Sequence, residues 1–292
     1  MKNLHDCALP QPRRHAPLLG GFACLAALAA APVLAAPIGA VADPCAGVAV
    51  QPTAAHRASS DWYGNWMHDW LAVDYGQRCR YAAENRELAA ASTTRVVFLG
   101  DSITEGWKDA TPAMFGADIL DRGIGGQTTE QMLVRFRTDV LDLHPAVVHI
   151  MAGTNDVAGN QGPTSVATIE GNIRSLVEQA RANGITVVIA SVPPASRFGW
   201  SPVENASDVI AELNAWLRAY ARREQLLYVD YYGLLADGHG GMRPAYSDDG
   251  VHPSRAGYEA MRPLALAALH AALESRGSSR RPRHGGVGRP RS

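Results

Sequence analysis

Residues 95–107 read Arg-Val-Val-Phe-Leu-Gly-Asp-Ser-Ile-Thr-Glu-Gly-Trp, and this stretch decides the expected fold. Its first half, residues 95–99, is a short run rich in Val and Leu, which is typical of a strand buried on both faces of a parallel sheet. Gly100 and Asp101 end the run, and Ser102 lies where a helix can begin. A buried strand followed closely by a helix is the repeating unit of α/β proteins.

The rest of the chain repeats this alternation. Further apolar runs span residues 118–122, 146–151, 185–192 and 226–229, the first being the weakest, and helical patterns cover about residues 128–143, 164–183, 204–224 and 254–274. The alternation predicts a three-layer α/β/α sandwich with a central parallel five-stranded sheet, of the flavodoxin-like kind, over residues 93–274. Ligands of such sheets bind beyond the carboxyl ends of the strands, so we expect chemistry in the loops after residues 99, 123, 151 and 192.

Ser102 has two interpretations. With Glu105 three residues later, it matches a capping box, in which the serine only begins a helix. A serine at a helix N-terminus is also well placed as a nucleophile, because its own N–H and the positive end of the helix dipole face a developing oxyanion.

The next two loops hold candidate hydrogen-bond donors for a ligand. Gly125 and Gly126 precede a helix that Thr128 is expected to cap, and glycines there let backbone N–H groups approach a ligand, although ordinary tight turns have the same composition. Asn155 follows the run that ends at Met151. Its side-chain amide can donate to a negative oxygen, while the alternative is a plain turn residue.

A base is predicted far downstream, just ahead of the last helix. Pro253 biases His252 toward an extended conformation at a loop edge, where its imidazole can accept a proton. Asp249, three residues earlier, can reach the other ring nitrogen and fix the tautomer. A turn at Asp249 and Gly250 accounts for part of this pattern without chemistry.

Taken together, the four blocks resemble the SGNH hydrolase family, also called GDSL-type esterases and lipases, over about residues 94–274, and residues 123–126 resemble its platelet-activating-factor acetylhydrolase-like branch. The resemblance implies a serine nucleophile at Ser102 with Asp249 and His252, and oxyanion donors at Ser102, Gly126 and Asn155. Arg122 departs from the family, which often has Asn there. Residue 104 is Thr, so Ser102 lacks the Gly-x-Ser-x-Gly elbow of α/β-hydrolases.

This reading predicts hydrolysis of short-chain, acetyl-type esters through an acyl-enzyme, without a metal or organic cofactor. The substrate is expected to be a small soluble or carbohydrate-linked ester, because the chain has no long apolar insertion to serve as a lid. Four aromatic or basic residues in or near these loops are candidates for shaping the pocket: Trp107, Arg197, Phe198 and Trp200.

Residues 43–92 predict a helical N-terminal extension. Trp62, Trp66 and Trp70 recur every four residues and form a stripe expected to pack against the main body, with a sugar-stacking surface as the alternative. Residues 1–42 are expected to be a signal peptide, because two arginines precede an apolar run too short for a membrane span. An exported, periplasmic or secreted, chain would keep Cys45 and Cys79, which predicts a disulfide.

Charge argues against a nucleic-acid partner. Without residues 1–42 and 276–292, the chain has 18 basic and 27 acidic residues, a charge of about −9. Residues 275–292 are rich in Gly, Ser, Pro and Arg and are expected to form a disordered tail. No stable membrane insertion is expected, and the oligomeric state stays open.

Two other classes of function remain. A metal-dependent phosphoesterase could use oxygen and nitrogen ligands, namely Asp101, Asn155, Asp156, Asp249 and His252, although a histidine-rich ligand set is missing. A non-catalytic carbohydrate-binding module could use the tryptophan stripe.

Overall fold

A computed structural model describes residues 43–58, 60–88 and 94–280. Its contacts separate Met1–Pro44 from a compact unit, Cys45–Ser292, and the fold below belongs to that second unit. The predicted signal peptide, residues 1–42, lies outside the described residues.

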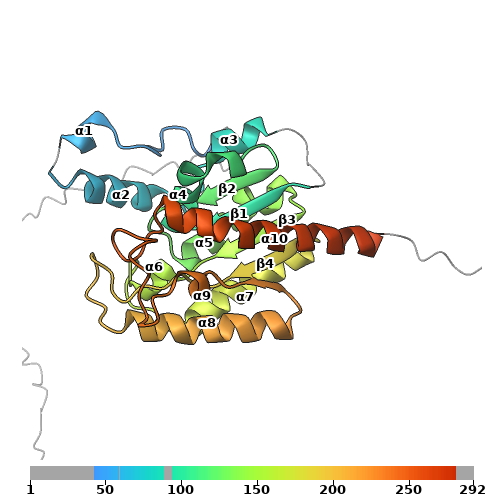
Figure 1. Cartoon of the computed structure of the whole chain (residues 1–292). Coiled ribbons are helices and arrows are strands. Elements are labelled where there is room, and N and C mark those ends of the chain that lie inside the picture. The colour runs from blue at the N-terminus through green and yellow to red at the C-terminus, as the bar shows by residue number, and fades with distance from the viewer. Residues whose placement is uncertain (1–42, 59, 89–93, 281–292) are drawn as a thin grey trace, which may run out of the picture. The chain divides into compact units, whose positions relative to one another are not determined.

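The centre of the unit is a five-stranded parallel sheet in the order β2-β1-β3-β4-β5 (Figure 1). The strands are β1 (Val96–Gly100), β2 (Ile119–Gly123), β3 (Val147–Met151), β4 (Thr186–Ala190) and β5 (Leu227–Val229). β1 pairs in register with both neighbours, Val96 standing beside Ile119 on one side and Val147 on the other. The predicted sheet is confirmed, with strand ends displaced by one or two residues.

Side chains alternate along the buried strands, so each face of the sheet has its own core and its own helices. Val97 and Leu99 face α5 (Thr129–Asp139), α7 (Val166–Ala182) and α8 (Ala206–Arg223). Val96 and Phe98 face α4 (Ser102–Ala110), α9 (Tyr231–Leu235) and α10 (Arg255–Arg280). The result is the predicted three-layer sandwich. Short helical turns complete it: η1 (Pro112–Met114), η2 (Leu141–Leu143) and α6 (Thr154–Val157).

The last helix is longer than predicted. α10 continues to Arg280, so the expected tail boundary at residue 275 is wrong. Leu269 and Ala272 are buried against the sheet, and the guanidinium of Arg276 donates to the carbonyl oxygen of Gly184 at 2.5 Å, which keeps the chain helical beyond that boundary. Residues 281–292 lie outside the described part. None of the helices in the described ranges is long and apolar enough to cross a membrane.

The extension belongs to the same compact unit as the sandwich. It contains α1 (Ala54–Arg57), α2 (Trp62–Val73) and α3 (Ala82–Glu87), and a disulfide joins Cys45 to Cys79. Trp70 is buried, and the ring of Trp66 packs on it at 5.2 Å while the Trp66 N–H donates to Ala49. These two rings therefore pack on each other within the extension, and packing of the stripe against the main body stays a prediction. The side chain of Trp62 lies outside the described residues.

Candidate active site

The first residue of α4 is Ser102, and the residue that caps this helix is Asp101. The Asp101 carboxylate accepts the N–H of Ile103 at 2.9 Å, so the expected capping box between Ser102 and Glu105 is wrong. Burial raises the pKa of Asp101 to about 6. Because a neighbour caps the helix, the hydroxyl of Ser102 is available for another partner.

That partner comes from a position 150 residues away. The Oγ atom of Ser102 lies 2.9 Å from Nε2 of His252, and Nδ1 of His252 lies 2.6 Å from a carboxylate oxygen of Asp249. The three side chains thus form a chain of two hydrogen bonds at the carboxyl edge of the sheet. A neutral imidazole in this arrangement keeps its proton on Nδ1, toward the carboxylate, and offers Nε2 to the hydroxyl.

Hydrogen bonds within the loop of residues 247–253 hold Asp249 and His252 in place. Oδ1 of Asp249 accepts the backbone N–H groups of Val251 and His252, each at 2.8 Å, and the Ser247 hydroxyl at 3.1 Å. Gly250 takes a φ of +80° in the turn, a conformation that favours glycine. Partial burial alone would raise the pKa of Asp249, but the hydrogen bonds from His252 and Val251 outweigh it and lower this pKa to about 2.

The second loop, residues 123–128, passes beside Ser102. A Cβ atom placed on Gly125 would lie 3.8 Å from Cβ of Ser102, and the Gly125 N–H donates to Glu105 at 2.8 Å. Gly126 follows with a φ of +78°. Neither the N–H of Ser102 nor that of Gly126 has a hydrogen-bond acceptor in the described part of the chain. The two backbone donors without an acceptor thus belong to Ser102 itself and to the residue after Gly125, which lies beside it.

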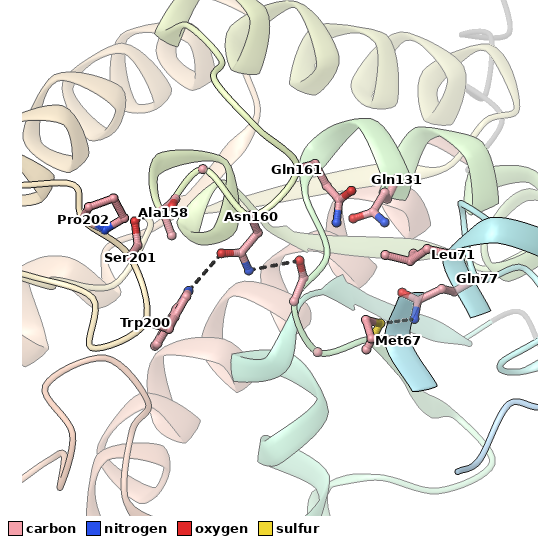
Figure 2. A pocket seen from close by; sticks show the side chains of 13 residues that line it. Met67, Leu71, Gln77, Gln131, Ala158, Asn160, Gln161, Trp200, Ser201 and Pro202 are labelled. Carbon is pink, nitrogen blue, oxygen red and sulfur yellow. Dashed lines mark hydrogen bonds between the residues drawn. The ribbon is translucent and has the colours of Figure 1, made fainter. Parts of the chain in front are cut away.

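Asn155, at the start of α6, is buried beside the same loop. One amide hydrogen donates to the carbonyl oxygen of Gln127 at 3.0 Å, which leaves the second hydrogen of that amide for another acceptor. Its Oδ1 accepts an amide hydrogen of Asn160 at 2.8 Å. Oδ1 of Asn160 in turn accepts the indole N–H of Trp200 at 2.9 Å, as Figure 2 shows. Sequence reasoning missed Asn160, whose only signal is a position one turn beyond the short helix.

The structure separates the four predicted pocket residues. Trp107 is fully buried and packs edge-on against Phe98 at 5.6 Å, so its prediction as a pocket residue is wrong: it belongs to the core under α4. Phe198 is buried behind Trp200, at 5.4 Å between ring centroids. Arg197 is exposed and does not line the pocket. Only Trp200 does, and its ring stands 5.9 Å from the imidazole of His252.

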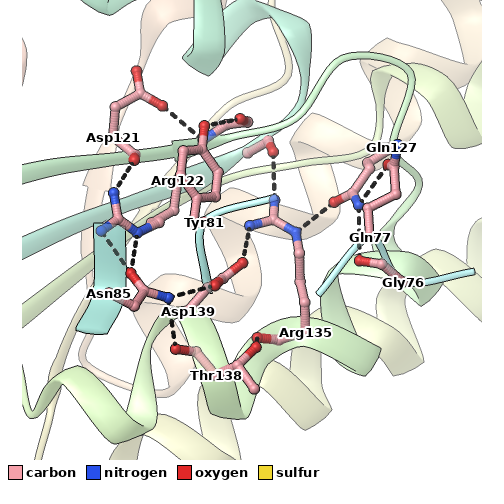
Figure 3. A network of polar contacts seen from close by, with 12 residues as sticks. Gly76, Gln77, Tyr81, Asn85, Asp121, Arg122, Gln127, Arg135, Thr138 and Asp139 are labelled. Carbon is pink, nitrogen blue, oxygen red and sulfur yellow. Dashed lines mark hydrogen bonds and ion pairs between the residues drawn. The ribbon is translucent and has the colours of Figure 1, made fainter. Parts of the chain in front are cut away.

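Arg122, which departs from the family pattern, has a structural role. Its buried guanidinium donates to Oδ1 of Asn85 at 2.7 Å and stacks over the ring of Tyr81 at 4.6 Å (Figure 3). It also donates to Glu84 at 3.0 Å. The Tyr81 hydroxyl donates to the carbonyl oxygen of Gly123. All three partners belong to the extension, so this arginine ties residues 81–85 to the start of the second loop.

A second buried arginine holds the far end of that loop. Arg135 donates to Gln127 at 2.5 Å, to the carbonyl oxygen of Gly100 at 2.9 Å and to Asp139 at 3.2 Å (Figure 3). The amide of Gln127 donates in turn to Gln77 of the extension at 2.9 Å. Sequence reasoning missed this network, because a helical arginine carries no sign of whether its side chain is buried.

The residues of the rival metal site are engaged with protein groups. Asp156 accepts the backbone N–H of Thr129 at 2.9 Å and its hydroxyl at 2.5 Å, Asp101 caps α4, and Asp249 holds His252. Within residues 43–58, 60–88 and 94–280, no three His, Cys, Asp or Glu side chains gather as metal ligands would.

Comparisons with known proteins identify the family of this chain. Residues 98–260 match the model of the GDSL-like lipase/acylhydrolase family. The chain is 28% identical over 181 residues to esterase TesA of Pseudomonas aeruginosa, which covers 58% of this chain and 83% of that protein. It is also 41% identical over 80 residues to the lipoprotein YqeF of Bacillus subtilis. That matched segment covers only 33% of YqeF and 26% of this chain.

Solved structures agree as well. A GDSL-like lipase from Bacteroides thetaiotaomicron is 42% identical, with a TM-score of 0.66 over 68% of this chain and 99% of that one. A Streptococcus pneumoniae structure described as a platelet-activating-factor protein is 21% identical with a TM-score of 0.60 over 72% of this chain and all of that one, a likeness of fold alone, so the branch stays a prediction. The family model covers more than half of the sequence and spans the strands, the loops and His252, and the chain therefore belongs to the GDSL-like lipase/acylhydrolase family.

Proposed function

We propose that this ester hydrolase is an exported serine esterase that cleaves short-chain, acetyl-type esters through an acyl-enzyme. The observation that supports the proposal most is the 2.9 Å contact between Oγ of Ser102 and Nε2 of His252, with the carboxylate of Asp249 at 2.6 Å behind the ring. A hydroxyl, a base and a group that orients the base, in hydrogen-bonding sequence, are the requirements of an activated serine nucleophile.

In the first half of the reaction, His252 takes the proton of Ser102 as Oγ attacks the ester carbonyl, and then gives that proton to the leaving alcohol. In the second half, His252 takes a proton from water as the water attacks the acyl-enzyme, and the acid leaves as Ser102 is protonated again. Asp249 stays ionised throughout, because its pKa is lowered to about 2, and stabilises the imidazolium that forms twice per cycle.

The negative charge on the substrate oxygen needs donors that are already in place. We assign this role to the N–H groups of Ser102 and Gly126 and to the side-chain amide of Asn155. Two observations support this assignment. Both backbone N–H groups lack an acceptor in the described residues, and Asn155 keeps one amide hydrogen unused. Loss of one such donor typically raises the barrier by about 3 kcal/mol, so Asn155→Ala is expected to lower kcat by about 10²-fold or more.

Export is supported by two features. The apolar run that follows two arginines near the N-terminus has the pattern of a secretory leader. The disulfide between Cys45 and Cys79 is of the kind that persists in oxidising compartments. The proposal requires neither a metal nor an organic cofactor.

Labelling with a fluorophosphonate, combined with a p-nitrophenyl ester series of increasing chain length, tests the proposal. We expect the label on Ser102, fastest turnover with acetyl or butyryl esters, and loss of turnover in Ser102→Ala with an unchanged circular dichroism spectrum. A label on another serine contradicts the site. Loss of activity in EDTA with recovery on adding metal supports the phosphoesterase instead.

A further inference from the structure

A pocket of about 360 Å³ opens beside the proposed nucleophile (Figure 2). Its walls come from helix α2 and Gln77 of the extension, from the second loop, from Gln131 of α5, and from the segments around Asn160 and Trp200. Gly125 and Gly126 are shared with the loop that passes Ser102, so the pocket adjoins the reacting centre. Its volume lies at the lower end of the ~300–1,000 Å³ typical of small-molecule sites.

The lining of this pocket is polar but carries no charge. Four amide side chains and one hydroxyl contribute to it, whereas no Asp, Glu, Lys, Arg or His does, and the remaining side chains are small or apolar. The amides are Gln77, Gln131, Asn160 and Gln161, and the hydroxyl is Ser201. Asn160 uses both of its amide hydrogens within the protein. Gln77 and Gln131 each use one amide hydrogen, and Gln161 is exposed, so the pocket keeps amide donors for ligand hydroxyl groups and has no charge to pair with a charged ligand.

Trp200 supplies a flat apolar surface at the end nearest His252. About half of this side chain is exposed (49%), although its indole N–H is already satisfied by Asn160. One side of the ring packs on Phe198 at 5.4 Å, and the ring stands 5.9 Å from the imidazole of His252. A large aromatic face left exposed beside a reacting group can stack against a ring of the substrate.

We propose that this pocket binds a sugar unit of the substrate, so that the ester is an acetylated carbohydrate whose alcohol side lies against Trp200. A sugar ring has apolar C–H faces that pack on an indole and hydroxyl groups around its rim that pair with amides. The acyl group is then the small part of the substrate and stays at Ser102. This inference rests on the proposed esterase function and specifies its substrate.

The test compares two neutral acetate esters, a methyl glucoside carrying acetyl groups and ethyl acetate, which has no ring to stack. We expect the wild type to have the higher kcat/KM for the acetylated glucoside. Trp200→Ala is expected to lower that value about five- to tenfold, mainly through KM, because one ring contact is lost. With ethyl acetate, which has no ring to stack on the indole, the same variant is expected to lose clearly less activity, so that the ratio of the two kcat/KM values falls.

Two further variants separate binding from positioning. Trp200→Phe keeps an aromatic face but loses the hydrogen bond to Asn160, so it is expected to retain most of the activity on the glucoside. Leu264→Ala, which removes an exposed apolar side chain on α10 that does not line this pocket, is the matched control and is expected to change neither ester. Equal losses on both esters in Trp200→Ala overturn the proposal, because Trp200 then acts through Asn160 and Asn155.

Failure of the inference and failure of the esterase proposal give different results. A wild type that cleaves ethyl acetate without preferring the glucoside overturns only the sugar pocket. A wild type that cleaves neither ester contradicts the esterase. Saturation-transfer NMR of the acetylated glucoside with Ser102→Ala tests the pocket independently of turnover: we expect binding that is lost in Ser102→Ala combined with Trp200→Ala, and absence of binding overturns the pocket.

Discussion

Two loops meet at Ser102, and they are held in opposite ways. The loop of residues 247–253, which carries Asp249 and His252, is partly exposed and is built by hydrogen bonds between residues two or three positions apart. The loop of residues 123–128 is largely buried and is held by residues of the extension 42 to 51 positions earlier in the chain. One geometry is encoded locally, and the other depends on a distant segment.

The difference shows what the extension does for this hydrolase. The family model begins at residue 98, yet Gln77, Tyr81 and Asn85 contact the second loop or the arginine that leads into it. Arg80 also donates to Oε1 of Glu105, and Oε2 of the same carboxylate accepts the N–H of Gly125. A change in the loop of residues 247–253 should therefore affect activity alone, whereas a change around the second loop, residues 123–128, should affect both stability and activity.

The largest effect is expected from His252→Ala, which removes the proposed base. Turnover of p-nitrophenyl acetate should fall by about three orders of magnitude or more. The urea midpoint should stay near that of the wild type, because the loop around residue 252 is held by Asp249 and Ser247. Retention of more than a tenth of the activity would contradict the assigned role.

Arg135→Met tests the second loop, residues 123–128. It leaves Asp139 buried without its ion-pair partner and releases Gln127, so the free energy of unfolding should fall by about 3–5 kcal/mol and activity should decrease with it. Arg137→Ala on the same helix removes an exposed pair with Asp142 and should change stability by no more than about 1 kcal/mol. Equal effects in urea unfolding would show that the buried network does not hold the loop.

The double variant Cys45→Ser with Cys79→Ser, which removes the disulfide, tests how strongly stability and activity depend on the extension. A bridge with a separation of 34 residues should stabilise by about 3–4 kcal/mol, because it restricts the unfolded chain. Cys79 immediately precedes Arg80, so kcat should also fall in the double variant at temperatures where it remains folded. Thermal unfolding with and without a reducing agent measures the first effect, and loss of stability with unchanged kcat would separate the disulfide from the site.

The last expected effect is a dependence of stability on pH, in which Asp121, beside the second loop, and Asp249, in the loop of residues 247–253, behave oppositely. Burial raises the pKa of Asp121 from 3.8 to about 7, so the native state holds that proton more tightly than the unfolded state. Its contribution to stability is complete below about 3.8 and is lost as the pH rises to about 7. The contribution of Asp249 is present above 3.8 and is lost as the pH falls through about 2.

Asp121→Asn should therefore flatten the decline in unfolding free energy between pH 4 and 7, as measured by urea titration at several pH values. A decline of unchanged slope in this variant would assign the effect to other groups, of which Asp101, with a pKa raised to about 6, is the first to test.

Much of the architecture was readable before any coordinates. Runs of Val, Ile and Leu located all five strands within two residues, since burial on both faces leaves a continuous apolar signature. The expected cap at Thr128 is also present, its N–H donating to Gln131 at 3.1 Å. Trp107 was misplaced because an aromatic residue one turn after Ser102 can face either the pocket or the core, and only packing against Phe98 decides which.

The sequence alone determined the order of strands and helices, the family and the four loops in which chemistry was sought, because backbone preferences and apolar periodicity act over a few residues. Only the tertiary structure decided that Asp101 caps α4, that Asn160 links Asn155 to Trp200, and that Arg122 and Arg135 anchor the second loop. Each is a contact of a particular polar side chain, and two of them, Trp200 with Asn160 and Arg122 with Asn85, join residues 40 and 37 positions apart. Whether a polar group finds such a partner depends on the packed position of every element around it.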